Sequence, residues 1–317
     1  MTISPSPRNK TLKILPEERE RLLASLSVPK KRLSSGELRN RLFKGDLFSL
    51  AGFFPSSCVD LMILDPPYNL DKAFRSSSFR KKSSSDYSAY LKSFLLPLKR
   101  LLKKEASLYL CGDWNSCGAI QQALEECGFF IRNRLTWQRD KGRGADKNWK
   151  NCSEDIWFAT CSQKYHFDAD AAKIRKKVIA PYREKGTPKD WQEGPGGRFR
   201  LTSPSNFLND ITVPYWSRPE NTPHPPQTPE KLMAKLILAS SREGDLVFDP
   251  FCGSGTTLVT AKKLSRDFCG IEREEEYCLY AAKRLENASL DRRIQGYDGE
   301  AFLERNAQYG EKTGKKT

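Results

Sequence analysis

FDPFCGSGTT, residues 248–257, joins a predicted strand to a predicted helix. Open α/β sheets bind ligands at junctions of this kind, outside the carboxyl ends of their strands. Gly253 and Gly255 carry no side chain, so the backbone can approach a ligand closely there. The hydroxyl side chains near the helix N-terminus, where a carboxylate or phosphate is favoured, belong to Ser254, Thr256 and Thr257.

An acidic residue completes this predicted binding site. Glu272 ends the next predicted strand, about 20 residues further on, where a carboxylate can accept hydrogen bonds from both hydroxyls of a ribose. The segment is not a Walker loop, because no Gly-Lys-Ser/Thr follows, and Leu258 occupies the third glycine position of GxGxxG. A tight glycine turn without a ligand is the alternative, which the matching Glu272 disfavours. We therefore predict a nucleoside-cofactor site.

Around this site, apolar strand patterns alternate with helical patterns, which is typical of an α/β fold. Residues 59–64 are nearly all apolar, as in a buried parallel strand. The alternation fails between 162 and 221, where Pro, Gly, Trp and basic residues crowd together, so we predict an insertion there. The other predicted strands are 42–44, 106–111, 131–137, 156–160, 246–248 and 268–272, and the predicted helices are 87–102, 115–127, 229–240, 257–264 and 275–287.

A second segment, Asp65-Pro66-Pro67-Tyr68, directly follows the buried strand. Two prolines cannot extend a hydrogen-bonded ladder, so the segment must project from the edge of the sheet. The Asp65 carboxylate and the Pro66 carbonyl are then two nearby acceptors, and Tyr68 offers an aromatic face beside them. This arrangement suits a flat group that bears an amine. A simple turn is the alternative.

Composition narrows the class of protein. The 317 residues include 54 Lys and Arg against 39 Asp and Glu, a formal charge of +15. This charge favours a polyanionic partner, nucleic acid first and a membrane surface second, over a merely soluble basic surface. No apolar run is long enough to span a membrane, and residues 1–10 lack the apolar region of a secretory signal. Nine cysteines without CxxC spacing and only two histidines favour a reduced, cytosolic protein without a structural metal.

Together, DPPYNL at 65–70 and FDPFCGSGTT at 248–257 resemble the amino-group DNA methyltransferases that use S-adenosylmethionine. LFKGD at 42–46 and HPPQTP at 224–229 fit the same family. The catalytic segment precedes the cofactor segment with a recognition region between them, which is similar to the circularly permuted β class. The resemblance covers roughly residues 40–288. It implies a Rossmann-like methyltransferase fold with a mostly parallel sheet and a small basic target-recognition insertion.

The resemblance also implies a division of the chain into five parts. Before the family's motifs begin, a short amphipathic helix that starts at Pro16 belongs to an arm that we expect to lie outside the core. The tail from Tyr309 onward is rich in Lys and Gly, and we expect it to be disordered. The expected parts are a basic N-terminal arm (1–38), a catalytic half (39–161), the target-recognition insertion (162–221), a cofactor-binding half (222–290) and a C-terminal tail (291–317).

Carried over to this chain, the family's motifs give each matching residue a role. The target base must leave the DNA helix, because pairing buries its amino group. Hydrogen bonds from the amine to Asp65 and the Pro66 carbonyl would favour a pyramidal nitrogen with its lone pair aimed at the methyl sulfonium, so neither a cysteine nor a metal is needed. The base would be held by Asp65, Pro66, Pro67 and Tyr68. The cofactor would contact Asp46 at its adenine end, Glu272 at its ribose, and His224, Thr228, Asp249, Phe251, Gly253, Ser254, Gly255, Thr256 and Thr257.

Double-stranded DNA is the implied partner. Basic side chains would meet its phosphates, which position a protein on DNA but do not specify a sequence. A solvated basic loop is the alternative for residues 75–85. The family also implies action on DNA in a prokaryotic cytoplasm, and leaves a homodimer and a cognate restriction endonuclease open. The expected DNA-binding residues are Arg75, Arg80, Lys81 and Lys82 in that loop, and Lys176, Lys177, Arg198 and Arg200 in the insertion.

Two features leave choices open. The family's link usually reads His-Pro-Thr-x-Lys-Pro, whereas Pro226 and Thr228 stand where Thr and Lys are usual, so the resemblance carries less weight at Thr228. Asp before Pro-Pro favours adenine N6 as the methyl acceptor, with cytosine N4 as the alternative. A non-catalytic nucleic-acid-binding module and a dinucleotide-dependent dehydrogenase are the other classes. Intact Asp65 and Tyr68 argue against the first, and the second leaves the Asp-Pro-Pro-Tyr segment unexplained.

Overall fold

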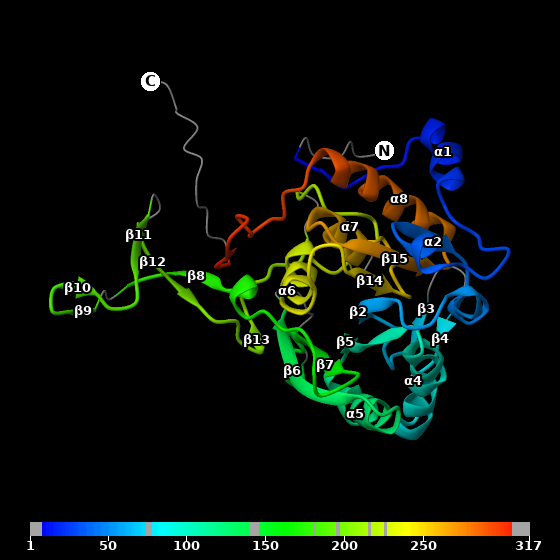
Figure 1. The fold of residues 1–317 in the computed structure, drawn as a ribbon, viewed down its shortest axis with the longest axis horizontal. Helices are drawn as coiled ribbons and strands as arrows, with labels where there is room; N and C mark the ends of the chain where they lie inside the picture. The colour runs from blue at the N-terminus through cyan, green and yellow to red at the C-terminus, as the bar shows by residue number, and fades with distance from the viewer. Residues whose placement is uncertain are drawn as a thin grey trace.

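The computed structural model describes residues 8–73, 78–139, 146–179, 182–194, 197–214, 217–224 and 227–305. Within them, an eight-stranded sheet forms the centre of the molecule (Figure 1). Its strands, in their order across the sheet, are β1 (Arg41–Lys44), β15 (Asp267–Glu272), β14 (Leu246–Asp249), β2 (Val59–Leu64), β5 (Leu102–Gly112), β7 (Ser153–Thr160), β6 (Phe130–Gln138) and β13 (Phe207–Leu208). Neighbours are parallel except where β7 pairs with β5 and with β6. The predicted α/β fold with a mostly parallel sheet is confirmed.

Helices cover both faces of this sheet. Met62 and Leu64 of β2 belong to one apolar cluster, and Leu61 and Ile63 belong to another. Since successive side chains of a strand point to opposite faces, a strand that is apolar throughout needs a layer of helices on each side. The first cluster includes residues of α2 (Ser35–Leu38), α3 (Leu47–Leu50), α4 (Ser84–Lys99) and α5 (Cys117–Glu126), and the second includes residues of α1 (Arg19–Ala24), α6 (Glu230–Ser240), α7 (Thr256–Lys263) and α8 (Glu275–Leu290).

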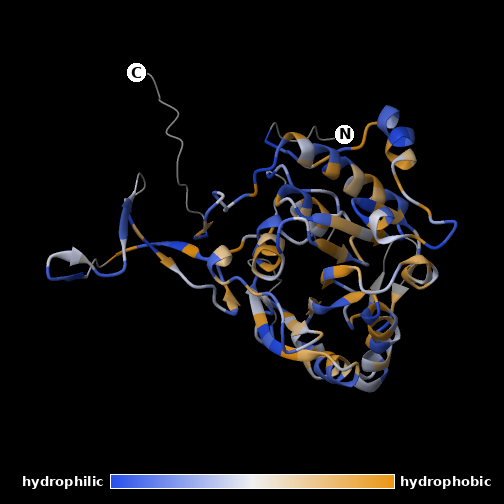
Figure 2. Cartoon of the chain, in the orientation of Figure 1, coloured by the Kyte–Doolittle hydropathy of each residue, from blue (hydrophilic) through white to orange (hydrophobic). Residues whose placement is uncertain are grey.

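Shorter elements complete the main body. In Figure 2 the central strands β14 and β15 are largely hydrophobic. None of the described helices is long and apolar enough to cross a membrane. A two-stranded sheet of β3 (Lys72–Ala73) and β4 (Ser78–Phe79) follows the Asp-Pro-Pro-Tyr segment. Single 3-10 turns are η1 (Pro16–Glu18), η2 (Ala51–Phe53), η3 (Trp114–Ser116) and η4 (Asp170–Ala172).

The sheet order brings the two motif-bearing strands together. β2 and β14 are far apart in sequence but adjacent and parallel, with Leu61 opposite Val247 and Met62 opposite Phe248. β15 is the next neighbour of β14. Parallel strands end at the same edge of a sheet, so Asp65, Asp249 and Glu272 all lie at the carboxyl edge. This edge is where an open α/β sheet binds its ligand.

The insertion projects from the body (Figure 1, left); it forms a separate two-stranded sheet and most of a small four-stranded sheet. Within it, β11 is hydrophilic (Figure 2). The expected boundary at residue 221 does not coincide with a change in packing. β13 extends the central sheet, and Ile211 and Val213 are buried in its second apolar cluster. The strands of the insertion are β8 (Ile174–Lys177), β9 (Arg183–Glu184), β10 (Thr187–Pro188), β11 (Gln192–Gly194) and β12 (Gly197–Thr202).

Part of the predicted C-terminal tail belongs to this small sheet. β16 (Phe302–Leu303) pairs in parallel with β8, which places Phe302 opposite Ile174. Phe302 is fully buried, and the Leu303 carbonyl accepts a hydrogen bond of 2.5 Å from Lys231 Nζ on α6. Residues 291–317 were expected to form a tail, but the apolar segment Ala-Phe-Leu at 301–303 supplies this strand. The expected disorder from 309 onward lies outside the described residues.

The N-terminal arm is packed on the body, contrary to expectation. Leu22 of α1 is fully buried in the apolar cluster that includes Leu285 of α8. Ion pairs join the two helices at their surface, between Arg19 and Glu275, Arg21 and Glu286, and Glu18 and Lys283. The short amphipathic helix α1 thus covers one side of α8. Without this contact, the apolar side of α1 would face water.

We expect Leu22→Ala to lower the free energy of unfolding by about 2–5 kcal/mol, because it leaves a cavity in the core. Val28 lies in the same arm with 64% of its surface exposed, so Val28→Ala is a matched control and should change stability by less than about 0.5 kcal/mol. Urea denaturation monitored by circular dichroism measures both. Equal midpoints for Leu22→Ala and wild type would show that the arm is not part of the folded core.

Candidate active site

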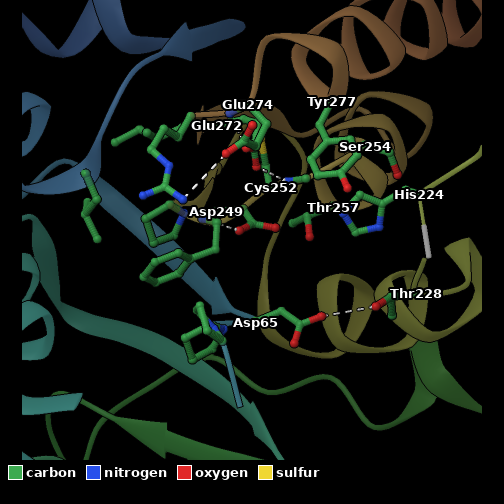
Figure 3. Close-up of a pocket in the computed structure, with 18 of the residues that line it drawn as sticks. Asp65, His224, Thr228, Asp249, Cys252, Ser254, Thr257, Glu272, Glu274 and Tyr277 are labelled. Atoms are coloured by element: carbon green, nitrogen blue, oxygen red, sulfur yellow. Dashed lines mark hydrogen bonds and ion pairs between the residues drawn. The ribbon is translucent and has the colours of Figure 1, made fainter. Parts of the chain in front are cut away.

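A cavity of about 430 Å³ opens at the carboxyl edge of β2, β14 and β15. It is lined from both of the segments that the sequence singles out, and Figure 3 shows the side chains facing one another across it. Gly255 does not line it. The predicted site residues that do are Asp46, Asp65, Pro66, Pro67, Tyr68, His224, Thr228, Asp249, Phe251, Gly253, Ser254, Thr256, Thr257 and Glu272.

The glycine turn forms one wall of the cavity. Gly253 and Gly255 have left-handed backbones, with φ of 51° and 79°, which favours glycine at both positions. A Cβ at Gly253 would lie 3.0 Å from His224 Nε2, and a Cβ at Gly255 would lie 2.7 Å from the Ala281 Cβ of α8. Gly253 therefore leaves room beside the cavity, whereas Gly255 lets α7 and α8 approach each other.

Glu272 is fixed by the backbone around it. Its Oε2 accepts a hydrogen bond of 2.9 Å from Gly253 N, and its Oε1 accepts one of 2.7 Å from Glu274 N. Burial raises the pKa of this carboxyl. Each carboxylate oxygen has room for a second hydrogen bond, so Glu272 can accept two hydroxyl donors from the cavity.

Asp249 ends β14 beneath the glycine turn. Its Oδ1 accepts a hydrogen bond of 3.0 Å from Phe251 N, and its side chain is buried. Burial raises the pKa of Asp249 to about 7, against the lowering effect of a hydrogen bond from Thr257, while the negative charges of Asp65 and Glu272 add to the rise. A cationic group in the cavity would remove this cost of ionisation.

The Asp-Pro-Pro-Tyr segment forms the opposite wall. Thr228 Oγ1 donates a hydrogen bond of 3.3 Å to Asp65 Oδ2 (Figure 3). Behind the segment, the Tyr87 hydroxyl donates one of 3.1 Å to the Pro67 carbonyl. Thr228, at the position where the sequence departs from the family pattern, thus contacts the Asp65 carboxylate.

Tyr68 lies near both Asp65 and Glu154 of β7. Its hydroxyl donates a hydrogen bond of 3.4 Å to Glu154 Oε2. Burial raises the pKa of this hydroxyl well above its usual range, and the negative charges of Asp65 and Glu154 add to the rise. Tyr68 therefore keeps its proton at neutral pH.

Several residues at the site escaped sequence reasoning, because their partners are distant in the chain. Buried Arg284 of α8 donates hydrogen bonds of 2.9 Å to the Ser254 carbonyl and to Thr256 Oγ1. The Tyr277 ring packs edge-on against His224, with centroids 4.3 Å apart. Of the residues that were missed, only Asn69 could have been found from the sequence, because it lies inside the DPPYNL segment.

Asn69 ties the basic loop to the catalytic segment. Its side chain accepts a hydrogen bond of 2.7 Å from Lys82 N and donates one of 3.0 Å to the Lys82 carbonyl. Arg80, Lys81 and Lys82 are exposed beside the cavity wall that Phe79 contributes. Arg75 lies outside the described residues.

The insertion brings together three of its four predicted basic residues. Arg200 of β12 lies opposite Lys176 of β8, and cross-strand neighbours share a face. Arg198 is two residues from Arg200 and lies on the same face. Lys177 pairs with Phe199 and lies on the other face.

Known proteins resemble this chain over most of its length. A family model described as DNA methylase (N6_N4_Mtase) matches residues 59–283. The Type II methyltransferase M.BglII of Bacillus subtilis is 30% identical over 261 residues, which are 79% of this chain and 68% of that protein.

Two solved structures share the fold. The PvuII DNA methyltransferase, described as cytosine-N4-specific, superposes with a TM-score of 0.60 at 19% identity, over 88% of this chain and 98% of that one. The M1.HpyAVI–SAM complex superposes with a TM-score of 0.51 at 22% identity, over 77% of this chain and 98% of that one. The family match includes both predicted segments, and the structure joins them in one cavity. This chain therefore belongs to the DNA methylase family of S-adenosylmethionine-dependent DNA methyltransferases.

Proposed function

We propose that this DNA methyltransferase methylates the N6 amine of an adenine flipped out of double-stranded DNA. The observation that carries the proposal is that Asp65 and Tyr68 face the same cavity as Asp249 and Glu272. A base held by the first pair would meet a cofactor held by the second. Asp before Pro-Pro supports adenine as the base.

The charge of the cavity fits S-adenosylmethionine. Within the described chain, its lining includes one Lys or Arg residue, Arg273, against six acidic ones. When bound, the cofactor supplies a methyl group on a positively charged sulfur and also carries an ammonium group, which such a lining attracts. The pyrophosphate of a dinucleotide would be repelled, which argues against a dehydrogenase. The six acidic residues are Asp46, Asp65, Glu154, Asp249, Glu272 and Glu274.

In this proposal the chain's own residues act by alignment and electrostatics. The Asp65 carboxylate and the Pro66 carbonyl accept the two N–H groups of the amine, and the Tyr68 ring stacks on the base. These hydrogen bonds concentrate electron density on the nitrogen and aim its lone pair. After transfer, the Asp65 carboxylate can take the proton that the nitrogen must lose. Glu272 would hold the ribose hydroxyls of S-adenosylmethionine, and Asp249 would face a cationic group of the same cofactor.

Basic residues outside the cavity would bind the DNA backbone. Arg80, Lys81 and Lys82 lie next to the proposed base-binding wall, and Lys176, Arg198 and Arg200 share a face of the insertion. Neutralisation of phosphates releases counterions, so affinity for DNA should fall steeply with salt. The likeness to a Type II methyltransferase supports a cognate restriction endonuclease as a further partner.

Cytosine N4 is the second candidate acceptor, because the PvuII enzyme with the same fold is described as cytosine-N4-specific. The test is incubation with methyl-labelled S-adenosylmethionine and unmethylated genomic DNA, followed by mass spectrometry of the nucleosides. We expect N6-methyladenine. N4-methylcytosine would select the second candidate, and no labelled nucleoside from folded, cofactor-binding protein would overturn the proposed activity.

We expect Asp65→Ala to lower kcat by at least ~10²-fold, since it removes one of two acceptors for the reacting amine. Calorimetry should show nearly unchanged affinity for S-adenosylmethionine. Asp291→Ala, which removes an exposed aspartate paired with Arg293, serves as the control and should retain full activity. Normal turnover by Asp65→Ala would refute the role given to this carboxylate.

Gly253→Val should weaken cofactor binding, because its side chain would push against His224 in the cavity wall. Gly244 also has positive φ, but a Cβ there meets no atom within 4 Å. Gly244→Val therefore shares the backbone strain without the clash, and its affinity for S-adenosylmethionine should match wild type. Equal affinities for all three proteins in calorimetry would place the cofactor elsewhere.

Asp249→Asn should stabilise the cofactor-free protein increasingly as pH rises. A carboxyl whose pKa is raised by folding stabilises the fold fully below its unfolded pKa of about 4, and this contribution is lost as pH rises through the folded value. Since the folded pKa is about 7, the melting temperature of the variant minus that of wild type should be larger at pH 8 than at pH 5. A difference that does not change with pH would contradict this assignment.

A further inference from the structure

We propose that Glu154, anchored by Arg139, positions the Tyr68 ring and so sets the aromatic surface on which the target base stacks. The inference rests on the proposed function, because it assigns a positioning residue to the same reaction. No motif of the sequence points to Glu154. It enters the site from β7, two strands away from the strand that carries Asp65.

The antiparallel direction of β7 explains how Glu154 reaches the cavity. Asp155 lies opposite Gly112, the last residue of β5. The start of β7 therefore lies beside the carboxyl end of β5, at the carboxyl edge of the parallel strands. There Glu154 lines the cavity together with Tyr68.

The two carboxylate oxygens of Glu154 have different partners. Oε2 accepts the hydrogen bond from the Tyr68 hydroxyl at 3.4 Å, and Oε1 forms an ion pair with the Arg139 guanidinium. Only 16% of the Glu154 side chain is exposed. Its rotation is thus restrained from one side by a charged partner, which leaves the other oxygen aimed at the phenol.

Arg139 is itself held by its surroundings. Its backbone N donates a hydrogen bond of 2.6 Å to the Cys152 carbonyl, and its guanidinium lies 5.5 Å from the centre of the Trp137 ring. Trp137 is buried and lies opposite Glu154 in the β6–β7 register. The pair is therefore anchored at the end of the β6–β7 ladder, since Glu154 belongs to β7 and Arg139 directly follows β6.

The contact matters because it lies at the far end of the Tyr68 side chain. The two prolines stiffen the backbone before Tyr68, but the ring still rotates about two side-chain bonds. A hydrogen bond at the phenolic oxygen removes most of that freedom before a base arrives. Since the raised pKa keeps the proton on the phenol, the hydroxyl is a donor. Asp65 is also near it, but that carboxylate is the one assigned to the target amine, so Glu154 is the acceptor that stays available to the phenol. Pre-arranged stacking lowers the cost of holding an unpaired base.

The test measures kcat and KM for DNA in four proteins: wild type, Glu154→Leu, Tyr68→Phe and the double variant. We expect Glu154→Leu to lower kcat/KM for DNA about 10–100-fold, the range for loss of one buried hydrogen bond, without changing the affinity for S-adenosylmethionine. Because Glu154 acts through the Tyr68 hydroxyl, kcat/KM for DNA in the double variant should be no lower than in the more impaired single variant. Glu154→Gln keeps an oxygen acceptor and should recover most of the activity.

The outcomes separate this inference from the proposed function. Failure of the wild type to methylate DNA would overturn the function itself. An active wild type with an equally active Glu154→Leu, or additive losses in the double variant, would overturn the role of Glu154 alone. Glu126→Leu is the control, because it removes the acid of a surface ion pair with Lys92 and should be fully active. If Glu154→Leu does not fold, Arg139→Met replaces it in the same cycle and should be coupled to Tyr68→Phe in the same way.

Discussion

The parallel pairing of β2 with β14 is the constraint on which the site depends. The two strands are separated by about 180 residues in the chain, and only their register across Leu61 and Val247 places Asp65 and Asp249 at one edge. Both strands carry buried apolar side chains on both faces, so either would be unstable outside the centre of a sheet covered on both faces. The demand for burial thus brings the two walls of the cavity together.

The cavity and the protein have opposite electrostatic characters. The chain carries a formal charge of +15, yet acidic side chains predominate among the described residues of the cavity lining. Outer basic residues attract a polyanion, whereas the inner carboxylates favour a cation and exclude phosphates. Such a division keeps a positively charged cofactor and a DNA backbone in separate regions. Burial raises the pKa of both Asp249 and Glu272, so the inner charge is costly until a cation offsets it.

Local patterns predicted both motifs and seven of the eight strands of the central sheet, all but β13, while contacts between distant residues decided the rest. The helix expected at 87–102 occupies Ser84–Lys99, because the Ser83 side chain caps its start and Leu102 already belongs to β5. Glu154 and Arg284 could not be identified, because each acts on a segment that only the tertiary fold places beside it. The buried arm and β16 were missed for a related reason. The helix of the arm was expected from its amphipathic pattern, but that pattern does not say what the helix packs on, and the apolar residues of β16 are too few to give a periodic signal. The two segments become buried only against α8 and β8.

The pairing of β16 with β8 has a consequence for how such enzymes diversify. The insertion depends on residues outside it. Phe302 and Leu303 complete its four-stranded sheet, and Lys231 donates hydrogen bonds to the carbonyls of both Leu303 and Asp210. An insertion exchanged between relatives as residues 162–221 alone would leave its edge strand behind. Recombination that transfers the whole four-stranded sheet would therefore have to carry two separate segments, the insertion and the residues around Phe302.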